Sequence, residues 1–88
     1  MSDVLVMNKA HMESLTQRFR QKAEEVERLR AEVTNLLGST TWDGARARRF
    51  RDEWNGTFSP NLVKLQTALD ENAGFLDQER ANAMTAMD

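Results

Sequence analysis

Two long stretches of this chain repeat their apolar residues at alternating steps of three and four. The first stretch extends from Met12 to Leu37, and the second from Ala47 to Leu76. Such steps place apolar side chains on one face of an α-helix. Only four glycines and one proline occur among the 88 residues, so few residues interrupt a helix. The sequence therefore predicts an all-α fold built from two long helices.

The first helix is predicted over about residues 9–37. Asn8 precedes it, and asparagine is a preferred N-cap because its side chain accepts hydrogen bonds from free amides of the first turn. Gly38 follows it and is expected to end the helix in the left-handed conformation. Thr40 or Thr41 is expected to cap the next helix. The short connection makes the two helices an antiparallel hairpin.

The second helix is predicted over about residues 44–82. Asn55-Gly56 and Ser59-Pro60 are typical of turns and would divide this segment into two helices. The apolar stripe nevertheless keeps its helical phase across both dipeptides, and an internal proline commonly bends a helix without ending it. We therefore expect one helix that is kinked near Pro60. If Leu37 lies beside Gly44, Arg49 should lie near Glu32.

The apolar stripes are too wide for two helices that contact only each other. The second stripe covers an arc of about 140°, and a small hairpin core rarely supplies more than about 3–5 kcal/mol. Two hairpins packed as a four-helix bundle would cover the remaining surface, so the sequence predicts a dimer with an identical or a related chain. The expected packing and dimer-interface residues are Leu15, Phe19, Val26, Leu29, Val33, Phe50, Trp54, Phe58, Leu65 and Leu69.

The composition argues against an enzyme. The chain has no cysteine and one histidine, too few ligands for a thiolate or histidine metal site within one chain. Its neighbouring carboxylates point about 100° apart on a helix and do not converge. No serine has the glycines of a nucleophile elbow. We expect no catalytic residue, no metal and no cofactor.

Charge and hydropathy limit the other function classes. The net charge of −2 at pH 7 gives no overall attraction to nucleic acid or to an anionic membrane. No apolar stretch approaches the length of a spanning helix, and the run Val4–Met7 is too short for a signal peptide. We expect one domain over 1–88 with flexible tails at 1–7 and 83–88, and no stable membrane insertion.

The predicted turn contains Trp42-Asp43-Gly44, a Trp-X-Gly motif between two amphipathic helices. With this motif and its length of 88 residues, the chain resembles the WXG family of type VII (ESX-like) secretion substrates. Residues of the second helix look like the pattern of actinobacterial members: Ala47, Phe50, Arg51, Glu53, Trp54, Pro60, Leu62, Leu65, Ala68 and Leu69. The resemblance implies export from the cytoplasm as a folded hairpin dimer, without a cleavable signal peptide. The secreted protein would act as an effector or as a co-secretion partner or chaperone.

Family members often carry a Tyr-X-X-X-Asp/Glu motif that the export ATPase reads. The nearest match here is Phe75 to Glu79, with Phe in place of Tyr, so these two residues are the candidate export signal unless the partner chain carries it. Trp42 is expected to close the apolar end of the hairpin or to serve in recognition. Gly44 is expected to allow a close backbone approach or a positive φ.

An alternative function rests on four arginines at the start of the second helix, between Arg46 and Arg51. A helical-hairpin dimer of this kind would act inside the cell as a regulator that binds RNA or another protein through this cluster. Acidic residues flank the arginines, and no aromatic side chain lies outside the apolar stripe to stack on bases. Nucleic acid is therefore not the expected partner.

Overall fold

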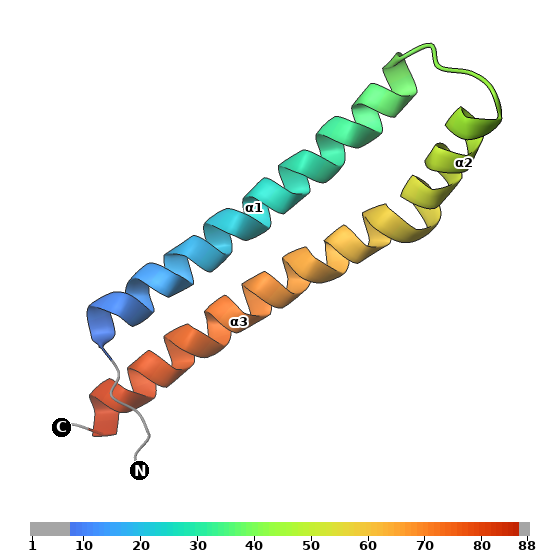
Figure 1. Cartoon of the computed structure of the whole chain (residues 1–88). Coiled ribbons are helices and arrows are strands. Elements are labelled where there is room, and N and C mark those ends of the chain that lie inside the picture. Colours follow the sequence, from blue (N-terminus) through green and yellow to red (C-terminus); the bar gives the residue numbers. More distant parts are fainter. Residues whose placement is uncertain (1–7, 87–88) are drawn as a thin grey trace.

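The computed structural model describes the backbone of residues 8–86 and the side chains of residues 8–82. Helix α1 spans Lys9–Ser39, α2 spans Ala45–Glu53, the π-helix η2 spans Trp54–Phe58, and α3 spans Ser59–Ala86. The last three follow one another without a break, and α3 runs antiparallel beside α1 (Figure 1). The predicted all-α helical hairpin is confirmed. The expected tail at 1–7 and residues 87–88 lie outside the described residues, whereas residues 83–86 belong to α3.

The start of α1 is as predicted, but its end is not. The Asn8 side chain accepts a hydrogen bond from the backbone N–H of His11 at 3.1 Å. The prediction that Gly38 ends the helix is wrong, because α1 continues to Ser39. Its last carbonyls have other donors: the Ser39 hydroxyl donates to Asn35, and the Arg51 guanidinium donates to Leu37. With these donors present, a left-handed glycine is not needed to close the helix.

Gly44 begins the second half of the hairpin and takes the positive φ that was one of its two predicted roles. Its φ is 105° and its ψ is 176°, a region that is essentially restricted to glycine. A Cβ built at Gly44 would meet no atom within 4 Å, so the dihedral angles and not the available space require glycine here. Gly44 itself is the N-cap of α2, and the expected caps at Thr40 and Thr41 are wrong.

We expect Gly44→Ala to destabilise the hairpin by about 1–3 kcal/mol, because this backbone conformation is strained for any residue with a Cβ. Gly38→Ala is the matched control. Gly38 lies inside α1 with open space around it, so alanine should stabilise the helix by up to about 1 kcal/mol. Urea unfolding followed by circular dichroism, at one fixed protein concentration, measures both. If the Gly44→Ala variant is as stable as the parent, the backbone conformation at residue 44 does not require glycine.

The π-helix η2 shifts which residues of the second half face α1. The backbone N–H of Ser59 donates to the Trp54 carbonyl, a step of five residues instead of four. Figure 1 shows the ribbon changing direction between α2 and α3 at this point. The expected kink near Pro60 therefore takes the form of a π-turn that ends directly before Ser59-Pro60. After it, the residues that face α1 lie one position later than an uninterrupted helix would place them.

The most buried positions of the seam between the helices are mainly small side chains. Thr16, Ala23, Ala47 and Ala73 are buried, with at most 2% of their surface exposed. Trp54, at 7% exposure, is the one large side chain in the buried class among the described residues. Its indole N–H donates to the Thr34 hydroxyl at 3.0 Å, and this contact fixes the register beside the turn. The expected pairing of Arg49 with Glu32 is wrong, because α1 is longer than predicted and a five-residue connection follows it.

Candidate interaction surface

The hairpin is a flat slab one helix thick. Its principal extents are 64 × 22 × 14 Å, and a single α-helix with its side chains is about 10–12 Å across. The radius of gyration is 19.1 Å, whereas a compact domain of this length has about 12 Å. In such a slab a side chain is covered by the neighbouring helix alone. Large apolar side chains therefore remain partly exposed.

On α1, residues seven apart form rows along the helix. One row faces α3 and is half-buried: Met12, Phe19, Val26 and Val33. The next row is exposed on one side of the slab and consists of Leu15, Lys22, Leu29 and Leu36. The row on the opposite side of the slab is mostly charged: Glu13, Arg20, Glu27 and Thr34. The two sides of the slab therefore differ sharply in polarity.

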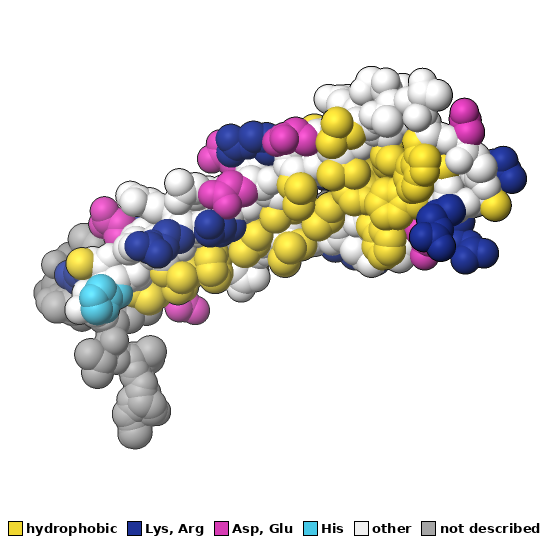
Figure 2. Space-filling model, turned by 45° about the horizontal axis from the view of Figure 1, so that its top comes forward, with side chains coloured by type: hydrophobic (Ala, Val, Ile, Leu, Met, Phe, Trp, Pro, Cys, Tyr) yellow, Lys and Arg dark blue, Asp and Glu magenta, His cyan; other side chains and the backbone are white. Residues whose placement is uncertain are grey.

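Helix α3 repeats this arrangement after the π-turn. Leu62, Leu69 and Leu76 are half-buried towards α1. Beside them lies an exposed row of Leu65, Asn72 and Glu79, which Phe58 at the end of η2 extends towards the turn. Figure 2 shows a band of hydrophobic side chains that runs along one side of the molecule, with charged side chains at its edges. We call this side the apolar face, defined by its large exposed residues Leu15, Leu29, Leu36, Phe58 and Leu65, with Phe75 at its margin.

Ion pairs join the two helices on the other side, the polar face. Arg20 contacts Asp77 at 2.7 Å, and Arg80 contacts both Glu13 at 2.8 Å and Asp77 at 3.1 Å. The hydrogen bond from Arg20, with the charges of both arginines, lowers the pKa of Asp77 below its ordinary value against a smaller opposing effect of desolvation. These pairs are partly exposed and orient the helices more than they stabilise them.

The turn end carries an aromatic cluster held by Arg51. The Phe50 ring lies 6.1 Å from Trp42, 6.4 Å from Trp54 and 6.3 Å from Phe58, measured between ring centroids. The Arg51 guanidinium lies 5.8 Å from the Trp42 ring and donates to the carbonyls of Leu37, Thr40 and Trp42. Arg51 thus ties the end of α1 and the turn to α2. Trp42 covers this cluster and stays 38% exposed.

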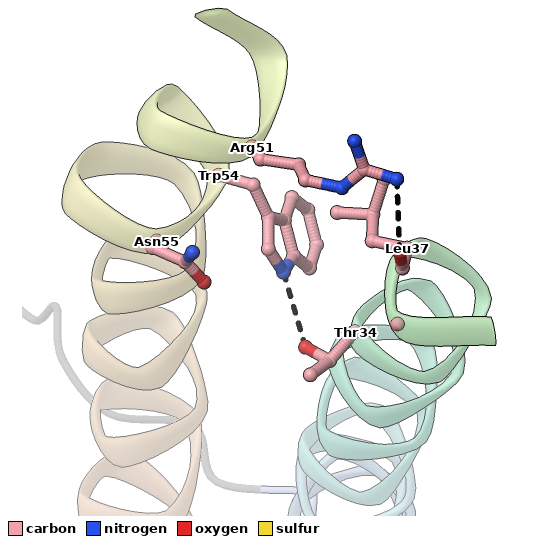
Figure 3. A pocket seen from close by; sticks show the side chains of 6 residues that line it. Thr34, Leu37, Arg51, Trp54 and Asn55 are labelled. Atoms are coloured by element: carbon pink, nitrogen blue, oxygen red, sulfur yellow. Dashed lines mark hydrogen bonds between the residues drawn. The ribbon is translucent and has the colours of Figure 1, made fainter. Parts of the chain in front are cut away.

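A groove of about 250 Å³ lies between the end of α1 and the start of the second half (Figure 3). Thr34 and Leu37 line it from α1, and Arg51, Trp54 and Asn55 line it from the other side. The polar hydrogens of Trp54 and Arg51 are directed at Thr34 and at the Leu37 carbonyl, as the dashed lines in Figure 3 show. The groove therefore belongs to the contacts that close the hairpin.

The residues singled out from the sequence fall into three places. Six predicted packing residues lie in or beside the seam: Phe19, Val26, Val33, Phe50, Trp54 and Leu69. Leu15, Leu29, Phe58 and Leu65 lie on the apolar face, where an interface role remains a prediction. The candidate export residues Phe75 and Glu79 are both exposed, one helical turn apart on α3. Two sets of contacts were not predicted from the sequence: the hydrogen bond that Thr34 accepts from Trp54, and the hydrogen bonds that Arg51 donates to backbone carbonyls. The pattern of apolar residues contains no signal for either.

The arginine cluster is divided by the fold. Arg46, Arg48 and Arg49 are exposed, whereas Arg51 is half-buried against the turn carbonyls. Asp52 and Glu53 are exposed directly after them. RNA binding through these arginines stays a prediction, for which a steep salt dependence of binding would be the sign.

Within the described part of the chain, no group of three or more His, Cys, Asp or Glu side chains is placed to hold a metal ion. Among the same residues, no helix is both long and apolar enough to cross a membrane. Comparison of the chain with protein-family models, with curated proteins and with solved structures gave no match.

Proposed function

We propose that this chain is a non-enzymatic pairing module whose apolar face packs against a second helical hairpin to form a four-helix bundle. One observation carries the proposal: a slab 14 Å thick exposes most of its large apolar side chains on one side, whereas the other side carries Val63 among charged residues. Stable domains normally consist of two or three packed layers around a core. A second hairpin, from an identical or a related chain, supplies the missing layer.

The exposed area supports this pairing. The chain exposes 6608 Å², whereas a compact monomer of its 10.1 kDa mass would expose about 5,300 Å². The difference of about 1,300 Å² exceeds the roughly 800 Å² that each partner buries in a protein interface of standard size. Covering the apolar face would therefore bury enough surface for a stable complex.

The proposed setting is type VII (ESX-like) secretion, in which the chain is exported from the cytoplasm as a folded pair and acts as an effector or as a co-secretion partner. The support is the hairpin itself, with Trp42 and Gly44 in its turn, in a chain whose sequence resembles the WXG family. Phe75 and Glu79 are the proposed contact for the secretion ATPase. Both side chains are exposed in the single hairpin. Since Glu79 belongs to the exposed row of the apolar face and Phe75 lies at its margin, the proposal requires the second hairpin to leave this end of α3 uncovered.

Export is tested by expressing the tagged chain in a bacterium with a type VII system and in a matched strain that lacks the export ATPase. The parent should reach the medium only in the first strain. Phe75→Ala and Glu79→Ala should each lower export at least about tenfold, because a recognition site for a partner depends on few side chains. Glu71→Ala, also exposed on α3, is the matched control and should be exported normally.

Equal amounts of the parent in the medium of both strains would refute the secretion proposal. The pairing proposal has its own readout. Size-exclusion chromatography with light scattering, on the chain alone and after adding a candidate hairpin chain of the related type, should show a complex of two hairpins.

A further inference from the structure

We infer that the connection between α1 and α2, residues 40–44, is a lid over the aromatic cluster that opens and closes while both helices stay folded, and that Arg51 holds it shut. The inference concerns the turn end alone and depends neither on the pairing of hairpins nor on secretion. Three observations carry it: the connection has few contacts, one side chain supplies most of them, and separate contacts hold the helices together.

The connection has little to hold it in place. All five of its residues are exposed, and Figure 1 shows it as a loop that joins the end of α1 to the start of α2. Over residues 41–43, the described part of the chain contains a single hydrogen bond, which the Trp42 carbonyl accepts from Arg51 at 2.7 Å. Exposed segments with few buried contacts open at a lower free energy than the rest of a fold. The connection is therefore suited to open locally.

Arg51 fastens the connection to α2. Besides the Trp42 carbonyl, its guanidinium donates to the Thr40 carbonyl at 3.3 Å, and it lies 5.8 Å from the centroid of the Trp42 ring. Its third acceptor is the Leu37 carbonyl near the end of α1, where the negative end of the helix dipole favours a cation. Among the described residues no carboxylate forms an ion pair with Arg51. The connection therefore depends on one side chain and on carbonyls alone.

The closed connection places the Trp42 ring over the aromatic cluster. The centroids of Trp42 and Phe50 lie 6.1 Å apart, and Phe50 also lies against Trp54 and Phe58. When the connection opens, the Trp42 indole leaves Phe50 and both rings become accessible. The lid thus controls how much aromatic surface the turn end presents.

The helices near the turn are held by contacts outside the connection. Ala47 is fully buried against the neighbouring helix, and the Trp54 indole N–H donates to the Thr34 hydroxyl. Further along the hairpin, the ion pairs of the polar face join α1 to α3. None of these contacts involves residues 40–44, so the hairpin remains closed when the lid opens.

Both ends of the connection are suited to act as hinges. Gly44 has a φ of 105° in the closed state, and glycine reaches other backbone conformations with little steric cost. At the other end Thr40 is extended, with a φ of −102° and a ψ of 131°. Hinges are commonly a few residues at the ends of secondary-structure elements that absorb large changes of dihedral angle.

Limited digestion with chymotrypsin tests the lid. The hydrophobic S1 pocket of this protease accepts tryptophan and phenylalanine, and cleavage after Trp42 requires an open connection. Arg51→Ala should raise the rate of that cleavage about tenfold or more, because a charged donor of several hydrogen bonds is lost. Cleavage after Phe19 and Phe75, inside the helices, should change far less. Arg49→Ala, which removes an exposed arginine of the same helix, is the control and should be cleaved like the parent.

Fluorine NMR of the chain labelled with fluorotryptophan gives a second measurement, which a general loss of stability would not imitate. The chain has two tryptophans, and Trp42→Phe assigns their signals. In Arg51→Ala the Trp42 signal should move towards that of the free amino acid. The Trp54 signal should keep its position, because its N–H remains bonded to Thr34. Circular dichroism should show unchanged helix content.

Two results would overturn the inference. If Arg51→Ala is cleaved after Trp42 no faster than the parent, Arg51 does not hold the connection. If cleavage rises equally after Trp42, Phe19 and Phe75, the connection opens only when the whole hairpin unfolds, and it is not a separate lid. Neither result bears on the pairing of hairpins, which light scattering on the parent chain measures.

Discussion

Leu65→Asp should abolish the pairing of hairpins while leaving a helical chain. Leu65 is 47% exposed at the centre of the apolar face, so in the single hairpin the aspartate has access to water. In a four-helix bundle the same carboxylate would be buried without a partner charge, at a cost of about 3–5 kcal/mol. A cost of this size raises the dissociation constant by about 150-fold to 5,000-fold. Light scattering over a concentration series measures the change.

Val63→Asp is the matched control for this variant. Val63 lies two residues earlier on α3, is 42% exposed and belongs to the opposite side of the slab. The same substitution there should leave association unchanged. If both variants behave alike, the apolar face is not the contact surface, and the pairing proposal fails regardless of the identity of the partner.

Trp54→Ala should have the largest effect on the stability of the hairpin itself. Trp54 is the large buried side chain of the seam, it lies beside Phe50, and it donates a hydrogen bond to Thr34. Replacing a buried tryptophan by alanine commonly costs about 3–5 kcal/mol. A small hairpin core gains little more than that in total, so the isolated variant should be largely unfolded at 25 °C. Urea unfolding followed by circular dichroism gives the difference.

Trp42→Ala provides the comparison, because Trp42 is 38% exposed and covers the cluster from outside. Its loss should cost clearly less than the loss of Trp54. The contribution of the hydrogen bond from Trp54 to Thr34 is measured with the single variants Trp54→Phe and Thr34→Val and with the variant that carries both changes. If the indole N–H stabilises the fold through Thr34, the double variant should be more stable than the sum of the two single changes predicts, whereas exact additivity would exclude this interaction. Equal effects of Trp42→Ala and Trp54→Ala would contradict the assignment of Trp54 to the core.

The sequence was sufficient to predict the hairpin, because the apolar spacing of α1 is regular over nearly four heptads and Asn8 marks its start. It was not sufficient for the connection between the helices. Gly38 and Thr40 have the residue types of a helix end and an N-cap, but Arg51, distant in sequence, supplies the donors that close α1. Such contacts depend on how the turn folds in space, which local residue preferences do not describe.

Before the π-turn, the predicted packing residues Phe19, Val26 and Val33 lie at the seam, whereas Leu15 and Leu29 lie on the exposed apolar face. After the π-turn, the residues that face α1 shift by one position. Ala47 and Trp54 face α1, and an uninterrupted helix would next have presented Phe58 and Leu65. Asn55-Gly56 and Pro60 mark this place as irregular, but the same residues are compatible with a simple bend. For this reason the apolar stripe by itself predicts one continuous face. The sequence therefore identifies the apolar residues of α3 but does not tell which of them face α1 and which are exposed.

The π-helix bears on how this chain should be aligned with other helical hairpins. It adds one residue between Trp54 and Ser59, so the heptad frame of α2 and that of α3 differ by one position. An ungapped alignment to a hairpin without the insertion would match interior positions with surface positions along all of α3. A single-residue gap within Asn55–Phe58 restores the correspondence, and sequence profiles built for such proteins should permit one there.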